Sequence, residues 1–166
     1  MEKAKQARRP ETKDDGKRFL AKFLGIFFAL FIILHLLDVT AISNFLAGAE
    51  AAALNSAGFH AAAQGHTLHA GNTEFLFVTD CTGLVMVILF AALLYSTNVP
   101  EDERRRALLV YAPLLLAFNF ARLFFTIAAG TMAPHLLDAI HAALWFVDSG
   151  VVLYAWSHVL GRRKAF

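Results

Sequence analysis

Four long apolar runs constrain this chain more than any other feature. Each run is close to the about 20 residues that a helix needs to cross the ~30 Å hydrocarbon core of a bilayer. Because a bilayer offers backbone groups no water, such runs are predicted to be helices. They cover residues 19–37, 82–98, 107–129 and 136–160. We therefore expect an all-α integral membrane protein, a bundle of about four transmembrane helices that forms a single membrane domain over residues 19–166.

The segments outside these runs differ in character. Residues 1–18 mix basic and acidic side chains without an apolar period, which predicts a disordered cytoplasmic tail. Apolar residues recur at helical spacing between Ile42 and Ala57, which indicates an amphipathic helix lying in the membrane interface. After Gly65, the turn pair Gly71-Asn72 predicts a short hairpin that ends near Val78. Both elements lie between the first two spans.

Positive charge predicts the orientation in the membrane. Of the 15 Lys and Arg residues, eight lie in residues 1–22, three in 104–106 and three in 162–164. With four spans and a cytoplasmic N-terminus, all three clusters are cytoplasmic and residues 38–80 are extracytoplasmic. The expected partner of the basic clusters is the anionic lipid headgroups of the membrane rather than nucleic acid. A fifth span over residues 41–63 would place the basic cluster 104–106 outside the cytoplasm, so the same rule argues against such a span. The first run exceeds the length of a signal-peptide core, so we expect an uncleaved anchor and a multi-pass protein of the cytoplasmic membrane with both termini inside.

The remaining basic residue, Arg122, is predicted to lie within the membrane, level with His141 and below Cys81. Cys81 is the single cysteine and begins the second span at the outer surface. At a rise of 1.5 Å per residue, Arg122 and His141 each lie roughly 10 Å below that surface. We expect the helix N-terminus and Arg122 to lower the pKa of the thiol, against the effects of Asp80 and burial. A nucleophile, a proton carrier and an anion stabiliser in one outward-facing pocket are what acyl transfer requires.

Other interpretations account for some of these residues. Cys81 on its own would suit simple packing. A non-enzymatic membrane protein would use Arg122, His141, Asp138 and Asp148 as a proton or ion path, but these groups gather in the outer half of the spans. A thiol oxidoreductase is disfavoured because the chain has no second cysteine to resolve a disulfide.

Two histidine pairs also have simple interpretations. His66 and His69 have no third ligand at a recognisable spacing, so we expect neither a metal nor a cofactor. His35 and Asp38 are three residues apart near the outer end of the first span, where they would share a helix face and pair.

Three short blocks carry a family resemblance. They are Thr79-Asp80-Cys81-Thr82-Gly83-Leu84, Asn119-Phe120-Ala121-Arg122-Leu123 and Asp138-Ala139-Ile140-His141 with Gly150 beyond. In order and spacing they resemble the signature blocks of the exosortase and archaeosortase family, in its compact, four-span form. The similar region covers roughly residues 51–154.

The resemblance implies a membrane cysteine protease and transpeptidase. Its substrates would be exported proteins with a C-terminal motif, a transmembrane helix and a basic cluster. The enzyme would form a thioester with them and pass them to an acceptor at the outer surface, for which a membrane lipid is one candidate. The resemblance also implies that Cys81 is the nucleophile and that Arg122 and His141 are its catalytic partners. Four further residues are candidates for supporting roles: Asp138, Asn119, Thr82 and Gly83.

Overall fold

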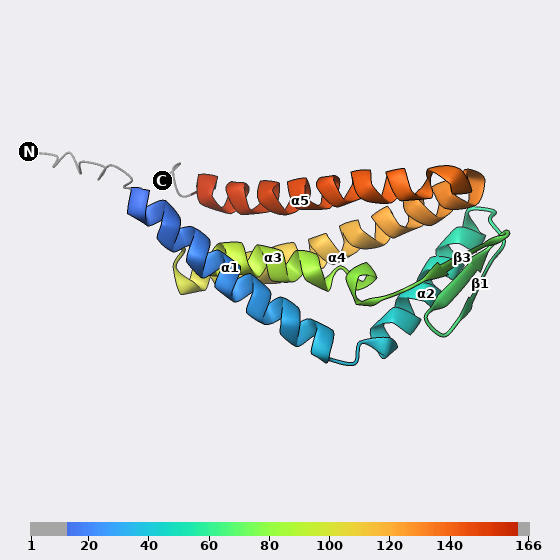
Figure 1. The fold of residues 1–166 in the computed structure, drawn as a ribbon, viewed down its shortest axis with the longest axis horizontal. Coiled ribbons are helices and arrows are strands. Elements are labelled where there is room, and N and C mark those ends of the chain that lie inside the picture. Colours follow the sequence, from blue (N-terminus) through green and yellow to red (C-terminus); the bar gives the residue numbers. More distant parts are fainter. Residues whose placement is uncertain (1–12, 163–166) are drawn as a thin grey trace, which may run out of the picture.

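The structure, a computed structural model, describes residues 13–162 and is mostly helical (Figure 1). Residues 13–18 of the predicted tail begin the first helix, and the rest of that tail lies outside the described residues. The elements in chain order are α1 (Lys13–Leu36), α2 (Thr40–Ser56), β1 (Ala61–Gln64), β2 (Thr67–Ala70), β3 (Thr73–Leu76), the 3-10 helix η1 (Thr79–Thr82), α3 (Leu84–Ser96), α4 (Glu101–Met132), the 3-10 helix η2 (Pro134–Leu136) and α5 (Leu137–Arg162).

The predicted helical membrane bundle is confirmed. Among the described residues, three helices are long and apolar enough to cross a membrane, namely α1, α4 and α5 joined to η2. The fourth apolar helix, α3, has 13 residues and so a length of about 20 Å. It begins at Leu84 rather than at Thr82, because the turn that carries Cys81 is a separate 3-10 helix.

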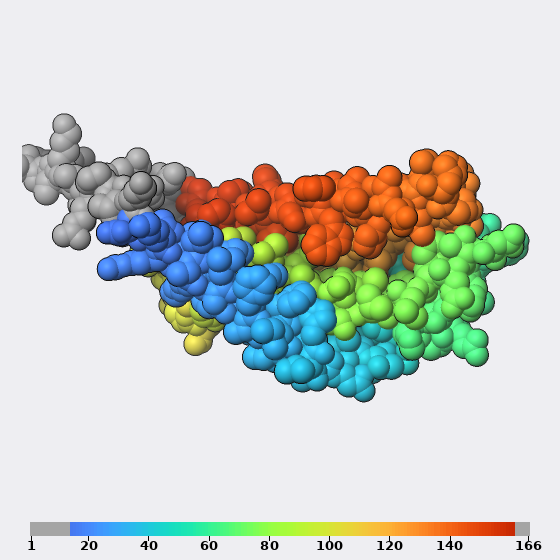
Figure 2. All heavy atoms as spheres, viewed as in Figure 1, coloured from blue at the N-terminus to red at the C-terminus, as the bar shows by residue number. Residues whose placement is uncertain are grey.

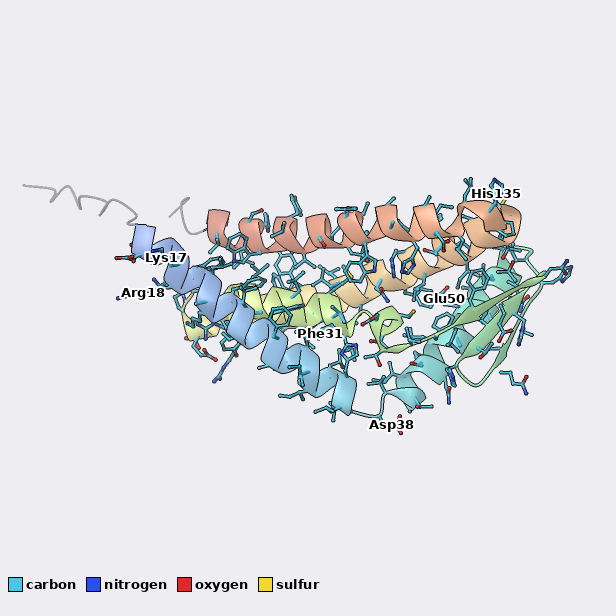
Figure 3. The ribbon with its side chains drawn as sticks, viewed as in Figure 1. Lys17, Arg18, Phe31, Asp38, Glu50 and His135 are labelled. Carbon is cyan, nitrogen blue, oxygen red and sulfur yellow. The ribbon has the colours of Figure 1, made fainter. Side chains whose placement is uncertain are left out.

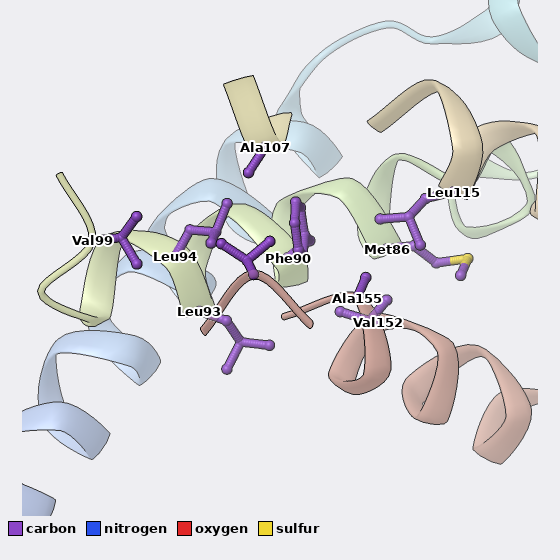
Figure 4. Close-up of a cluster of buried hydrophobic side chains, with 10 residues drawn as sticks. Met86, Phe90, Leu93, Leu94, Val99, Ala107, Leu115, Val152 and Ala155 are labelled. Atoms are coloured by element: carbon purple, nitrogen blue, oxygen red, sulfur yellow. The ribbon is translucent and has the colours of Figure 1, made fainter. Parts of the chain in front are cut away.

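Large apolar side chains point outward along the bundle. Leu36 is 80% exposed, Leu109 is 77% exposed and Phe146 is 81% exposed. In water such a surface would be an aggregation liability, whereas in a bilayer these side chains contact lipid tails. The inner core surrounds α3 (Figure 4), and Phe90, Leu94 and Val152 are fully buried within it. This core joins α3 to α4 and α5.

The connection between α3 and α4 is shorter than the stretch of residues 99–106 that separates the second and third apolar runs of the sequence. Helix α4 begins at Glu101, so the three arginines lie in its first two turns. Arg104 donates to the Glu101 carboxylate at 2.6 Å and to the Val99 carbonyl at 2.9 Å, and its guanidinium stacks over the Tyr95 ring. These contacts fix the start of α4.

The segment between the first two apolar helices contains the predicted amphipathic helix, as α2, and the predicted hairpin, as β2 and β3. The pair Gly71-Asn72 turns between these strands, and Leu68 faces Phe75 across them. A third strand, β1, pairs antiparallel with β2. The sequence Ala61-Ala62-Ala63 gave no sign of it, because alanine has a low strand propensity.

The face of α2 that packs on the protein is mixed in character, because it carries the buried apolar residues Ala47 and Leu54 as well as two buried polar residues. Ser43 and Glu50 are 3% and 0% exposed, whereas Phe45 is 73% exposed. Glu50 lies where α2 runs beside α4 (Figure 3). This orientation suits a helix whose outer face contacts lipid.

Helices α1 and α5 lie along opposite sides of α3. Figure 2 shows side chains of α3 between them on the drawn face. Helix α1 packs mainly against α3, and Phe19, near the start of α1, stacks on Trp156, near the end of α5. The described part of α1 begins, and that of α5 ends, at the end of the bundle opposite the sheet (Figure 1).

Candidate active site

The turn that carries Cys81 is held by local hydrogen bonds. The amide of Cys81 donates to the carbonyl of Val78 at 2.9 Å, which closes the 3-10 turn. Thr82 donates from its hydroxyl to the carbonyl of Thr79 at 2.6 Å and accepts from the amide of Leu84 at 3.3 Å. Thr82 thereby connects the turn to the first residue of α3.

Gly83 allows the chain to leave this turn and enter α3 directly. Its φ of +77° lies in the left-handed region, which glycine adopts without steric cost. A Cβ at this position would lie 2.9 Å from the Cβ and Cγ atoms of Asn119. The backbone of the turn therefore lies directly against α4.

Asn119 fixes this approach with a hydrogen bond. Its Nδ2 donates to the carbonyl oxygen of Cys81 at 2.8 Å, and the side chain is 2% exposed. Arg122 lies one helical turn further along α4. One face of α4 thus contacts the cysteine turn and carries the buried cation.

Arg122 is buried and has an acidic partner. The residue is 6% exposed, and its Nε lies 3.3 Å from Oδ2 of Asp148 on α5. A buried charge requires such a partner, because an unpaired one would retain most of its desolvation cost. Arg122 is also close enough to the Cys81 thiol to act on it electrostatically.

A cavity of about 260 Å³ opens beside this ion pair. Helices α1, α3 and α5 supply its apolar lining, and polar groups gather where Arg122 and Asp148 face it. The residues that line it are Phe27, Phe28, Phe31, Asp80, Val85, Met86, Leu89, Asn119, Arg122, Trp145, Asp148, Ser149 and Val152. The cavity thus combines a mostly apolar lining with the charged and polar side chains of Asp80, Asn119, Arg122 and Asp148.

The thiol itself departs from the expected pKa. Burial raises the pKa of Cys81 above its ordinary value, more than a backbone hydrogen bond at Val78 and the Arg122 charge lower it, and the Asp80 charge adds to the increase. The predicted lowering is therefore wrong for this conformation. Burial is the main cause, and Cys81 lies in the 3-10 turn before α3 rather than in the first turn of that helix. The Sγ atom lies 3.9 Å from the carbonyl oxygen of Leu76, as a protonated thiol would.

His141 lies in a neighbouring part of the site. It is exposed on α5 and, with Asp138, lines a second cavity of about 510 Å³. Trp145 and Ser149 line both cavities. His141 is close enough to Asp148 to act on it electrostatically. The structure thus joins Cys81, Asn119, Arg122 and Asp148, and it connects His141 to this group through the α5 face.

Comparison with protein families assigns the chain to a family. The model described as transmembrane exosortase (Exosortase_EpsH) matches residues 14–160. The chain belongs to the transmembrane exosortase family. Exosortases process C-terminal sorting signals, so membership implies an enzyme that acts on substrates with such signals. Searches of curated proteins and of solved structures found no significant match.

Two features of this exosortase were not predicted from its sequence. His35 does not pair with Asp38. Its Nε2 lies 3.2 Å from Oδ1 of Asp80, whereas Asp38 accepts a hydrogen bond from the amide of Thr40 at 2.9 Å, in the link between α1 and α2 (Figure 3). A contact between residues 45 positions apart leaves no local pattern in the sequence. The second feature is Glu50, which is buried although the sequence places it among the polar residues of α2.

Proposed function

We propose that this exosortase is a membrane cysteine protease and transpeptidase in which Cys81 is the nucleophile. The observation that carries the proposal is that α4 holds the backbone of Cys81 through Asn119 and, one turn away, carries a buried cation whose charge acts on the thiol. A single fixed element therefore positions a nucleophile beside a group that stabilises anions.

In the proposed reaction, His141 takes the proton of the Cys81 thiol, and the thiolate attacks the substrate carbonyl before the sorting tail. Arg122 stabilises the tetrahedral oxyanion. His141 then gives the proton to the leaving amine, and the carbon–nitrogen bond breaks to leave a thioester on Cys81. An acceptor amine, hydroxyl or water attacks the thioester and loses a proton to His141, which returns it to the sulfur.

The pKa of the free thiol supports a separate base in this scheme. Because burial keeps Cys81 protonated, Arg122 alone does not generate the thiolate in the resting conformation. His141 lies in the adjoining cavity, so the proposed proton transfer requires a shift of the side chain or of α5 when substrate fills the site. Asp148 would hold Arg122 in place during this shift.

The proposed substrate site is the cavity between α1, α3 and α5. Its apolar lining suits the membrane-embedded part of a sorting tail, and its polar end suits the peptide bond to be cleaved. In the proposed topology, residues 38–80 and this site face the extracytoplasmic side, while the basic clusters of residues 1–22, 104–106 and 162–164 are cytoplasmic.

Co-expression with a reporter that carries a C-terminal motif, a transmembrane helix and a basic cluster tests the proposal. Cys81→Ala should abolish tail cleavage. Arg122→Lys keeps the charge but not the planar fork of donors, so cleavage should fall by about 10²- to 10³-fold, as when one oxyanion donor is removed. His141→Ala should be at least as damaging, and Asp138→Asn should cause only a modest loss.

His135→Ala provides the matched control, because His135 is an exposed histidine in η2 near the same end of α5 (Figure 3). It should cleave like the unaltered protein at equal membrane levels. If Cys81→Ala, Arg122→Lys and His141→Ala all remain folded and cleave normally, the catalytic assignment is wrong. A non-enzymatic proton or ion path through the same groups would then replace it.

A further inference from the structure

The outer end of α1 reaches the cysteine turn through one side chain. Nε2 of His35 lies 3.2 Å from Oδ1 of Asp80, the residue before Cys81. The two side chains are 35% and 49% exposed, so the pair lies at the mouth of the site. Phe31, one turn earlier on α1, lines the cavity that Asp80 also lines.

Both ring nitrogens of His35 face hydrogen-bond acceptors. Its Nδ1 lies 2.9 Å from the carbonyl oxygen of Phe31, which can only accept a hydrogen bond. Its Nε2 faces the Asp80 carboxylate, which also accepts. This arrangement suits an imidazolium, which has a donor at each nitrogen, and the ring rests against the Phe31 ring with 4.2 Å between ring centroids.

The charge of Asp80 acts on the thiol. Asp80 is adjacent to Cys81 in sequence, and its negative charge raises the pKa of the Cys81 thiol while Arg122 opposes it. A cation held against Asp80 offsets that negative charge. The His35 ring occupies this position, and its contact with Asp80 joins α1 to the cysteine turn.

We propose that His35 is a positioning residue which holds the Asp80 carboxylate and offsets its charge, so that docking of α1 on the cysteine turn increases the reactivity of Cys81. The inference rests on the proposed role of Cys81 as nucleophile. It makes α1 part of the active site, although no residue of α1 touches the reacting atoms. Without a positive charge at position 35, the Asp80 charge is no longer offset and the thiolate becomes less favourable.

The ionisable groups near the pair of His35 and Asp80 either have other partners or lie at the far end of a neighbouring helix. Asp38, in the link after α1, is bound to the amide of Thr40. Arg122 and Asp148 pair with each other on the far side of the cavity. Helix α3 contributes Tyr95 alone, at its distant end beneath Arg104. Asp80 is thus the charged group that His35 meets.

Labelling of Cys81 with a small maleimide measures this effect without any cleavage assay. The chain has one cysteine, so labelling reports on that thiol alone. His35→Gln keeps a hydrogen-bond donor but removes the charge. Because exposed ion pairs contribute little, we expect labelling near pH 6 to slow by about two- to fivefold. Asp80→Asn should accelerate labelling by a similar factor, and in that background His35→Gln should have no further effect.

Two controls separate this role from general damage. His69→Gln changes an exposed histidine on β2 and should leave labelling unchanged. About 1 M salt should shrink the effect of His35→Gln, since it reduces the Debye length to about 3 Å. If His35→Gln slows labelling equally with and without Asp80, or not at all, the proposal is overturned.

The same measurement is independent of the proposed function. If Cys81→Ala still cleaved the reporter, Cys81 would not be the nucleophile. The coupling between His35 and Asp80 would nevertheless remain measurable by labelling variants that retain Cys81. If the cleavage tests succeeded and the coupling were absent, only the role of His35 would be wrong.

Discussion

The amide of Asn119 donates a hydrogen bond of 2.8 Å to the carbonyl oxygen of Cys81. This bond joins α4 to the cysteine turn across 38 positions of sequence. Asn119 and Arg122 are one helical turn apart, so a displacement of the turn from Asn119 also changes its distance from Arg122. The hydrogen bond therefore determines how the thiol lies relative to the buried cation.

Asn119→Ala should impair tail cleavage without removing any proposed catalytic group. A buried hydrogen bond that loses one partner costs about 1–3 kcal/mol. If that cost falls on the position of the turn, cleavage should decrease by about 5- to 150-fold, measured at matched membrane levels. Asn72→Ala, in the exposed turn between β2 and β3, is the control and should cleave normally. Equal cleavage by both variants would show that the turn keeps its position without Asn119.

Gly83→Ala should be more damaging than the same change at another glycine with positive φ. Gly58 has a φ of +88° with nothing within 4 Å of a Cβ, whereas a Cβ on Gly83 would meet Asn119 at 2.9 Å. Both changes incur about 1–2 kcal/mol of backbone strain, and only Gly83→Ala adds a clash. Tail cleavage should be lost with Gly83→Ala and largely kept with Gly58→Ala. Similar activity in both would argue against close packing of the turn on α4.

The sequence predicts the depth of the site residues but not the rotation of the helices that carry them. Counting residues along each span predicts Cys81 at the outer surface, with Arg122 and His141 roughly 10 Å below it. It did not indicate which way each helix faces, so His141 lies in the adjoining cavity rather than beside Cys81. The need of a buried cation for an acidic partner can be inferred from sequence, and the structure shows that Asp148 is the partner of Arg122.

The orientation of α2 shows a second limit. The periodicity of α2 indicated an amphipathic helix, and this is confirmed. The periodicity did not indicate that the apolar residues would divide between two faces. Ala47 and Leu54 pack inward beside the buried Glu50, whereas Phe45 is exposed, as suits contact with lipid.

Asp148→Asn should destabilise the protein more than the double change Arg122→Gln with Asp148→Asn. The single variant leaves the Arg122 charge buried without its partner, which costs about 3–5 kcal/mol in comparable sites. The double variant removes both charges and most of that penalty. Thermal unfolding in detergent micelles measures the difference. If the double variant is the less stable of the two, the pair is not coupled as its 3.3 Å separation indicates.

Reporter fusions should place residues near Gly71 outside the cytoplasm and residues near Arg105 inside it. The charge clusters predict this orientation, and the structure puts the β2–β3 turn and the start of α4 at opposite ends of the bundle. An extracytoplasmic signal from the fusion near Arg105 would contradict the proposed topology and the outward-facing site with it.

Glu50 should make the protein less stable as the pH rises. Burial raises the pKa of Glu50 from 4.5 to about 8, and neither carboxyl oxygen has a hydrogen-bond partner. Between these two pH values the folded protein holds a proton that the unfolded chain has released. The free energy of unfolding therefore decreases with pH across this window, by up to about 1.4 kcal/mol per pH unit, and becomes constant above about pH 8.

Glu50→Gln removes this titration while keeping the shape of the side chain. Its stability advantage over the unaltered protein should be small near pH 5, should grow as the pH rises, and should level off above about pH 8. Thermal unfolding in detergent micelles across that range provides the measurement. Glu74→Gln, at an exposed position of β3, is the matched control and should show no such trend. A constant difference between Glu50→Gln and the unaltered protein at every pH would show that Glu50 ionises in the folded state as readily as in the unfolded chain, which would mean that water or a cation reaches it.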